Sequence, residues 1–218
     1  TNGVLNHRAI LILPALTGNI PVPRHDGRSH APLTNDITLH QTIDDMPPGV
    51  GSERFPLWTR LSREMQSNTL ADQIDSGKPY PIKALFSAGL DLQFFANCNR
   101  MTESLKKLDF IATADYFETP GTRLADIVLP IASWLEREIL HGLRSRHVSL
   151  IEPAIEPLGE CWPEWKIYSE LAGRLGFGEL FWDGAFGKCV DYILAPSGIT
   201  YEDLKKHSNG LRLPPSPK

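Results

Sequence analysis

Two acidic residues and a glycine follow apolar runs near the middle of the chain, where these residue types could bind a nucleotide. Gly89 and Asp91 come directly after the apolar run 82–88, and Asp115 follows the next run, 108–114. A glycine at a strand end lets a ligand approach the backbone, and the amides that open a following helix suit a phosphate. An aspartate at the next strand end could accept two hydrogen bonds, from a ribose diol or from the N1–H and 2-amino group of guanine. The same residues could instead form a turn and cap the elements that follow them, and the pattern alone leaves both interpretations open.

The elements that must position these residues are short apolar strands separated by a helix. The runs 82–88, 108–114 and 127–129 have the profile of buried parallel strands, and 91–106 has helical spacing. Strand, helix, strand, loop and strand at these spacings predict a βαβ unit with a parallel sheet. In such a sheet ligands bind beyond the carboxyl ends of the strands, where Gly89, Asp91 and Asp115 would lie.

The composition argues against several classes of function. The net charge of −4 argues against a nucleic-acid-binding protein, which would present a basic face. Three cysteines, widely spaced and odd in number, exclude a disulfide framework and a CxxC metal site, so we expect reduced, mostly buried thiols. No apolar run approaches the roughly 20 residues that span a bilayer, and no signal peptide opens the sequence, so we expect a soluble chain without direct membrane insertion.

Other residues have weaker claims to function. No GxGxxG sequence follows a strand, and Gly176-Phe177-Gly178 follows a predicted helix, where it is typical of a C-cap. The remaining candidates are metal ligation by His25 and His30 or by Glu138 and His141, diphosphate contacts by Arg144 and Arg146, and stacking on Trp162 or Trp165. For all of these we favour a structural explanation, and we assign no catalytic residue and no metal ligand to the chain.

Several motifs resemble those of the dimethyl-sulfoxide-reductase family of molybdopterin oxidoreductases. The most specific are ADYFET at 114–119, ADIVLP at 125–130 and WLE at 134–136. Further matches follow in the family's order along most of the chain: LTGNI at 16–20, WKI at 165–167, LAGRLG at 171–176 and SGITYEDL at 197–204. The resemblance implies an internal fragment, mainly the third, Rossmann-like domain, of an enzyme that carries molybdenum or tungsten on molybdopterin guanine dinucleotide.

The resemblance also implies roles for particular residues. Asp115 matches the acidic residue that binds the guanine base, Thr119 matches a threonine close to the same nucleotide, and Asp126 lies in the nearby ADIVLP element. Together with the loop after the first strand, the predicted cofactor-binding residues are Gly89, Leu90, Asp91, Asp115, Tyr116, Thr119 and Asp126. The chain departs from the family in two places. Asp91-Leu92 replaces Asn-Pro in the loop after the first strand, and Ile139-Leu140 replaces a frequent glycine after the WLE motif, so no contacts are transferred to residues 139 and 140.

We therefore expect an α/β fold: a three-layer Rossmann-like domain with a mostly parallel sheet over about 78–152, an N-terminal helix and arm, and C-terminal helices. The expected limits are 1–55 for the tail of a preceding domain and its arm, 56–178 for the guanine-nucleotide-binding domain, and 179–218 for a helical extension. A further strand is predicted at 148–151, and helices at 4–13, 58–70, 164–176, 184–194 and 201–207, the last capped by Thr200 and Asp203.

By the same resemblance, redox catalysis belongs to the full-length parent and this fragment alone is inactive. An iron–sulfur cluster and the metal-ligating side chain are expected in earlier domains, and an iron–sulfur electron-transfer subunit is the expected partner. Two alternatives stay open: a non-catalytic scaffold relative that has lost the cofactor, and a different nucleotide-dependent enzyme. The resemblance is compatible with either molybdenum or tungsten, and with a location in either the cytoplasm or the periplasm of a prokaryote.

Overall fold

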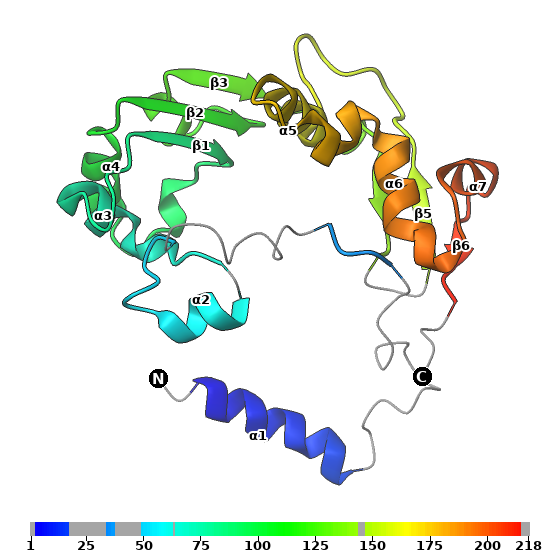
Figure 1. Ribbon diagram of the computed structural model, residues 1–218, viewed down its shortest axis with the longest axis horizontal. Coiled ribbons are helices and arrows are strands. Elements are labelled where there is room, and N and C mark those ends of the chain that lie inside the picture. Colours follow the sequence, from blue (N-terminus) through cyan, green and yellow to red (C-terminus); the bar gives the residue numbers. More distant parts are fainter. Residues whose placement is uncertain (1–2, 18–33, 38–48, 63, 144–146, 215–218) are drawn as a thin grey trace. The chain divides into compact units, whose positions relative to one another are not determined.

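The computed structural model describes residues 3–17, 34–37, 49–62, 64–143 and 147–214. Internal contacts divide the chain into two compact units (Figure 1). One unit comprises 37–137 and 153–178, and the other comprises 1–36, 138–152 and 179–218. The segment 138–152 therefore groups with the C-terminal residues, and the domain limits drawn from the sequence stay a prediction.

The first unit contains a parallel sheet of three strands in the order β1-β2-β3 (Figure 1). These strands are β1 (Ala84–Ala88), β2 (Phe110–Asp115) and β3 (Ile127–Pro130). Both pairings are parallel, with Ala88 opposite Ala114 and Asp115 opposite Pro130. The predicted parallel sheet is confirmed for these three strands, and β2 is buried along most of its length because it has a neighbour on each side.

Helices cover both faces of this sheet, which gives the predicted three-layer α/β arrangement. They are α3 (Leu70–Ser76) and α4 (Cys98–Leu105) on one face and α5 (Glu164–Arg174) on the other. Since side chains alternate along a strand, Leu85 and Ile111 share a core with α3 and α4. Phe86 and Ala114 point the opposite way and pack with Ile167 of α5.

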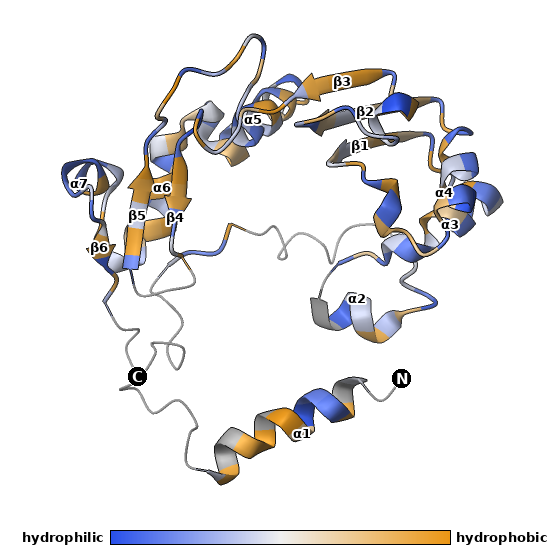
Figure 2. Ribbon diagram, turned by 180° about the vertical axis from the view of Figure 1, so that it is seen from behind, coloured by the Kyte–Doolittle hydropathy of each residue, from blue (hydrophilic) through white to orange (hydrophobic). Residues whose placement is uncertain are grey.

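The second unit contains an antiparallel sheet, which corrects one prediction. Its strands are β4 (Ile139–His141), β5 (His147–Ile151) and β6 (Leu211–Arg212), in the order β4-β5-β6. The strand predicted at 148–151 exists, but its assignment to the parallel sheet is wrong. Val148 and Leu150 are buried while His147 is exposed, and this alternation is typical of an antiparallel strand with one covered face. Figure 2 shows β5 mostly in the orange of hydrophobic residues.

Two helices cover the buried face of this small sheet. They are α6 (Phe186–Leu194) and α7 (Tyr201–Lys206), and both agree with the predicted helices at these positions. Leu194 and Leu204 pack with Val148 in one apolar cluster. The predicted capping box is confirmed, because the Thr200 side chain accepts from the Asp203 amide and the Asp203 carboxylate accepts from the Thr200 amide.

Two predicted helices are interrupted. The helix expected at 91–106 consists of a 3-10 turn, η3 (Leu92–Phe94), followed by α4, because Asn97 accepts from the Arg100 amide and starts a new helix there. The helix expected at 58–70 consists of α2 (Pro56–Ser62) and, beyond residue 62, the separate turn η2 (Ser67–Thr69) before α3. The remaining described helical elements are α1 (Gly3–Leu16), η4 (Thr122–Leu124), η5 (Gly178–Gly184) and η6 (Ala195–Ser197).

Some expectations concern residues outside the described part of the chain, and others are corrected by it. His25, His30, Arg144, Arg146 and most of the connecting segment 19–56 lie outside the described residues.

All three cysteines are free, but the expectation that they are mostly buried is wrong: Cys98 is exposed at the start of α4, and the other two are half-buried. Within the described residues, no helix has the length and apolar character to cross a bilayer.

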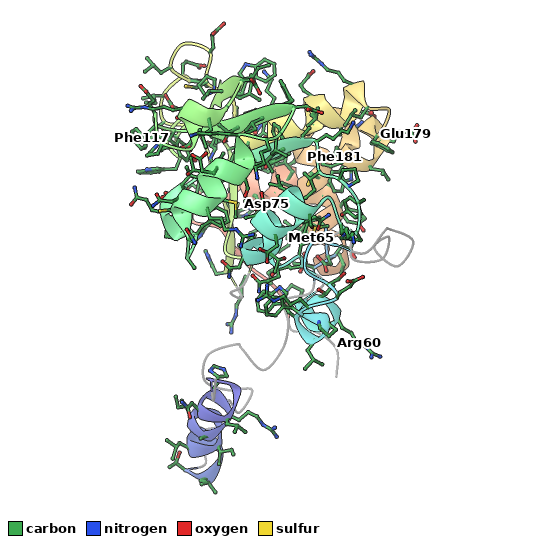
Figure 3. The ribbon with its side chains drawn as sticks, turned by 90° about the vertical axis from the view of Figure 1, so that its left-hand side faces the viewer. Arg60, Met65, Asp75, Phe117, Glu179 and Phe181 are labelled. Carbon is green, nitrogen blue, oxygen red and sulfur yellow. The ribbon has the colours of Figure 1, made fainter. Side chains whose placement is uncertain are left out.

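Charged side chains join α3 to α4 on the outer side of the first unit. Asp75, labelled in Figure 3, accepts from Lys107 Nζ at 2.7 Å, from Ser104 Oγ at 2.8 Å and from Arg100 at 3.3 Å. Arg100 also pairs with Asp72 at 2.6 Å. The hydrogen bond from Lys107, followed by that from Ser104, lowers the pKa of Asp75 from 3.8 to about 2.

We expect Asp75→Asn to lower the free energy of unfolding at pH 7, because the ionised carboxylate is the acceptor for three donors. A group whose pKa is lower in the folded state stabilises the fold above its unfolded pKa and loses that contribution as pH falls toward the folded value. The difference between wild type and the variant should therefore be full above pH 4 and shrink between pH 4 and pH 2. Urea unfolding at several pH values measures it, and a difference independent of pH would contradict the role given to the charge.

Candidate functional site

The loop after β1 begins with a glycine in a conformation that favours glycine. Gly89 has φ +71°, and its amide donates to the Ala114 carbonyl at 2.8 Å, so it extends the pairing of β1 with β2 by one residue. A Cβ built at Gly89 would meet no atom within 4 Å, so the space beside this backbone is open. A ligand can therefore approach the main chain at this strand end.

The two residues that follow Gly89 have different environments. Leu90 is buried in the core of the first unit, so only its backbone is available at the strand end. Asp91 caps the turn η3, because its Oδ1 accepts from the Gln93 amide at 2.9 Å. The structural interpretation of Asp91 as a cap is thus realised for one oxygen of its carboxylate.

Asp115 ends β2 next to this loop. Its Oδ1 accepts from the Tyr116 amide at 2.7 Å and from the Phe117 amide at 3.4 Å, which fixes the carboxylate relative to the backbone. Among the described residues, Oδ2 of Asp115 has no hydrogen-bond partner. The Asp115 carbonyl accepts from the Ile131 amide at 3.1 Å, which also ties the strand end to the segment after β3.

The loops after β1 and β2 are in direct backbone contact. A Cβ built on Gly121 would lie only 1.6 Å from the carbonyl oxygen of Leu90, so no other residue fits here without a shift. Gly121 therefore lets the loop after β2 pack against the loop that carries Gly89 and Asp91. This contact brings the predicted residues at the two strand ends together.

Thr119 helps to fix the shape of the second loop. Its amide donates to Thr122 Oγ1 at 2.8 Å, and its own Oγ1 accepts from the Thr122 amide at 3.2 Å. Thr122 is buried, so this reciprocal pair anchors the loop to the interior. Tyr116 and Phe117 lie between Asp115 and this anchor, with ring centroids 6.5 Å apart.

Asp126 lies at the other end of β2. Its Oδ2 accepts from the Ile111 amide at 2.7 Å, and its amide donates to the Ile111 carbonyl at 2.8 Å. Four residues of strand, about 13 Å, separate Ile111 from Asp115. The structure therefore does not bring Asp126 together with the other predicted residues, and it gives the Asp126 carboxylate the task of joining the start of β3 to β2.

A third loop follows β3, and hydrogen bonds to the Glu136 carboxylate fix its backbone. Glu136 accepts from the Ser133 amide at 2.6 Å and from the Leu158 amide at 3.0 Å. The hydrogen bond from the Ser133 backbone is the main cause of a lowered pKa for Glu136. Beside this loop the Trp162 backbone pairs with Pro130 and Ala132, and Lys166 Nζ lies 4.0 Å from the centroid of the Trp162 ring.

Glu138, which the sequence offers with His141 as a candidate metal ligand, has a structural role in the second unit. Glu138 accepts from the Tyr201 hydroxyl at 2.5 Å within the second unit, which joins β4 to α7. Burial, followed by this hydrogen bond, raises the pKa of Tyr201. Within the described part of the chain, no three His, Cys, Asp or Glu side chains lie close enough together to hold a metal ion.

Two features of the site were missed by the sequence reasoning. Gly121 lies between the second and third apolar runs, but nothing in the neighbouring residues signals its contact with Leu90, which depends on how two distant loops pack. Phe117 was not singled out, although an aromatic pair directly after Asp115 is visible in the sequence. The site thus combines an open glycine backbone, a fixed carboxylate and exposed aromatic rings at one edge of a parallel sheet.

The match to a known family covers this whole arrangement. The sequence model of the family described as molybdopterin oxidoreductase matches residues 1–174, which include the parallel strands and the loops that follow them. The chain belongs to the molybdopterin oxidoreductase family. The family predicted from the motifs at 114–119 and 125–130 is therefore confirmed.

Several family relatives are enzymes of different kinds. The alpha subunit of an F420-dependent formate dehydrogenase from Methanocaldococcus jannaschii is 31% identical in an alignment of 225 residues that covers 94% of this chain and 32% of that protein. A nitrate reductase from Symbiobacterium thermophilum is 38% identical over 136 residues, 56% of this chain and 17% of that protein. The solved structure of acetylene hydratase from Pelobacter acetylenicus has a TM-score of 0.68 at 26% identity, and the match covers 85% of this chain and 30% of that one. The chain spans about a third, or less, of the length of these family members.

We expect Gly121→Ala to lower the free energy of unfolding by roughly 1–3 kcal/mol, the usual cost of forcing an extra carbon into a packed site. Gly173→Ala is the matched control, since Gly173 lies in α5 with no atom within 4 Å of a built Cβ. That change should stabilise the protein by up to about 1 kcal/mol, because alanine favours a helix more than glycine does. Chemical denaturation measures both, and equal effects would contradict the close approach of Gly121 to Leu90.

We expect Asp126→Ala to cost roughly 1–3 kcal/mol of stability, because it leaves the buried Ile111 amide without its acceptor. Asp126→Asn keeps an acceptor oxygen and should cost clearly less. The same denaturation measurement compares them. An Asp126→Ala protein as stable as wild type would contradict the role given to this carboxylate in joining β3 to β2.

Proposed function

We propose that this chain binds the guanosine diphosphate arm of a molybdopterin guanine dinucleotide, through the loops 89–91 and 115–119. The larger protein that contains these residues is then a molybdenum or tungsten oxidoreductase, in line with the family. The observation that carries the proposal is Asp115: its carboxylate is fixed through Oδ1, while Oδ2 has no partner among the described residues. A fixed carboxylate at the carboxyl end of a parallel strand is suited to reading a ligand bound at that edge.

The residues present fit such a nucleotide. The open space beside Gly89 admits a phosphate or ribose close to the main chain, where a side chain would obstruct it. Lys166, at the start of α5, supplies a positive charge beside the end of β3. Leu90 would contribute through its backbone only, because its side chain is buried.

The chain's own residues would bind and orient the nucleotide, while the bound cofactor supplies the redox chemistry through its metal. Asp115 would accept from N1–H and the 2-amino group of guanine, a donor pair that adenine lacks. Asp91, whose Oδ1 caps η3, would offer its other oxygen to the ribose hydroxyls. Tyr116 and Thr119 would shape the loop around the base, since Thr119 is tied to the buried Thr122.

The reaction of the larger protein is a wider question, and the relatives support two candidates. A redox reaction fits the relatives named formate dehydrogenase and nitrate reductase. Addition of water fits the relative named acetylene hydratase, whose solved structure resembles this chain. Dye-linked assays of the purified full-length protein separate the two. A redox reaction reduces an electron-accepting dye or oxidises an electron-donating dye, whereas addition of water changes neither dye. An iron–sulfur cluster and an electron-transfer subunit are proposed for the redox case.

We expect Asp115→Asn to remove the preference of the chain for GDP over ADP, because the amide replaces one of two acceptors by a donor. Loss of a buried charge-assisted pair of hydrogen bonds corresponds to roughly a tenfold or larger loss of GDP affinity. Gly89→Ala should weaken both nucleotides by less. Calorimetric titration with GDP and ADP measures this, and unchanged discrimination in Asp115→Asn would refute the role in base recognition.

A further inference from the structure

The ring of Phe117 is exposed although the loop that carries it is well fixed. Phe117 is 78% exposed and projects from the first unit (Figure 3), whereas the neighbouring Tyr116 is 46% exposed. Phenylalanine contributes a large apolar area when it is covered, so an exposed ring forgoes much of that stabilisation. A surface ring of this kind on a fixed loop is suited to contact a ligand.

The loop is fixed on both sides of the ring. On one side the Phe117 amide donates to Asp115 Oδ1, and on the other the pair of Thr119 with Thr122 anchors the chain. Glu118 pairs with Arg123 at 2.8 Å, which adds a contact across the turn. The backbone position of Phe117 relative to the Asp115 carboxylate is thus determined before any ligand binds.

We infer that Phe117 stacks on the purine base whose edge Asp115 binds. This inference rests on the proposed guanosine site. A base held by its edge leaves both of its faces available, and an aromatic ring two residues from the carboxylate is within reach of one face. Stacking accepts any base because every base has a π face, so Phe117 supplies affinity and Asp115 supplies the choice of guanine.

The division of roles gives a test in which the two residues fail differently. The 218-residue chain is titrated with GDP, ADP and inorganic pyrophosphate, for wild type and for single variants. Phe117→Ala should weaken GDP and ADP by the same factor, roughly tenfold, because one stacked base contributes on that order, and should leave pyrophosphate unchanged. Phe117→Leu should behave like alanine, since it keeps apolar volume but loses the flat face, and Phe117→Trp should retain affinity.

Two other exposed phenylalanines serve as comparisons. Phe177, which follows α5, is the matched control, and its change to alanine should alter neither nucleotide. Phe94, 87% exposed in η3 after β1, tests whether the ring on the other loop does the stacking. A larger loss in Phe94→Ala than in Phe117→Ala would overturn the assignment to Phe117.

The remaining outcomes separate the inference from the proposed function. If wild type prefers GDP and Asp115→Asn loses that preference, but Phe117→Ala and Phe117→Leu bind GDP within twofold of wild type, only the stacking role is overturned. If folded wild type binds no nucleotide, or binds GDP and ADP equally, the guanosine site itself is overturned and the stacking role with it. If Phe117→Ala binds GDP and ADP more weakly by the same factor and keeps the preference for GDP, the result supports both the stacking role and the guanosine site.

Discussion

The parallel pairing of β1 with β2 is the constraint on which the candidate site depends. Because Ala88 lies opposite Ala114, both strands end at the same edge of the sheet, and the Gly89 amide still donates to the Ala114 carbonyl. The glycine backbone and the Asp115 carboxylate are therefore neighbours. An antiparallel pairing of the same two segments would place them at opposite edges. The contact between Gly121 and Leu90 then holds the two following loops against each other.

The acidic residues of the first unit divide between structural and binding roles according to their partners. Asp75 accepts from three side chains and joins α3 to α4, and Asp126 accepts from a strand amide and joins β3 to β2. Asp115 differs, since its fixed carboxylate keeps one oxygen without a partner among the described residues. Residue type alone does not distinguish these cases, because Asp115 and Asp126 both flank an apolar run and yet have different partners.

Much of the first unit could be predicted from the sequence. The three apolar runs predicted β1 to β3, their spacing predicted that the strands pair in parallel, and the motifs at 114–119 and 125–130 identified the family. The partner of β5 could not be predicted in this way, because an alternating strand reveals which face is covered and not which strand lies beside it. The break at Asn97 was missed since helical spacing continues across it, although asparagine is a common N-cap.

The candidate site could be predicted only in part. Gly89 and Asp115 lie together as their positions at strand ends imply, whereas Asp126 lies at the far end of β2. Sequence proximity to the ADIVLP element did not reveal this, because the chain between Asp115 and Asp126 returns to the opposite end of the sheet, where the parallel strand β3 starts. The contact of Gly121 with Leu90 joins residues from two loops, and no local pattern encodes it.

The most direct test of the central claim is the map of amide chemical-shift changes when GDP is added to the folded chain. The account predicts saturable changes at Gly89, Asp91, Tyr116 and Phe117, with Ile111 and Asp126 at the opposite end of β2 unchanged. Changes confined to that opposite end, or to residues 49–79, which precede β1 and contain none of the predicted site residues, would contradict it. A folded chain that shows no saturable change with GDP would contradict it equally.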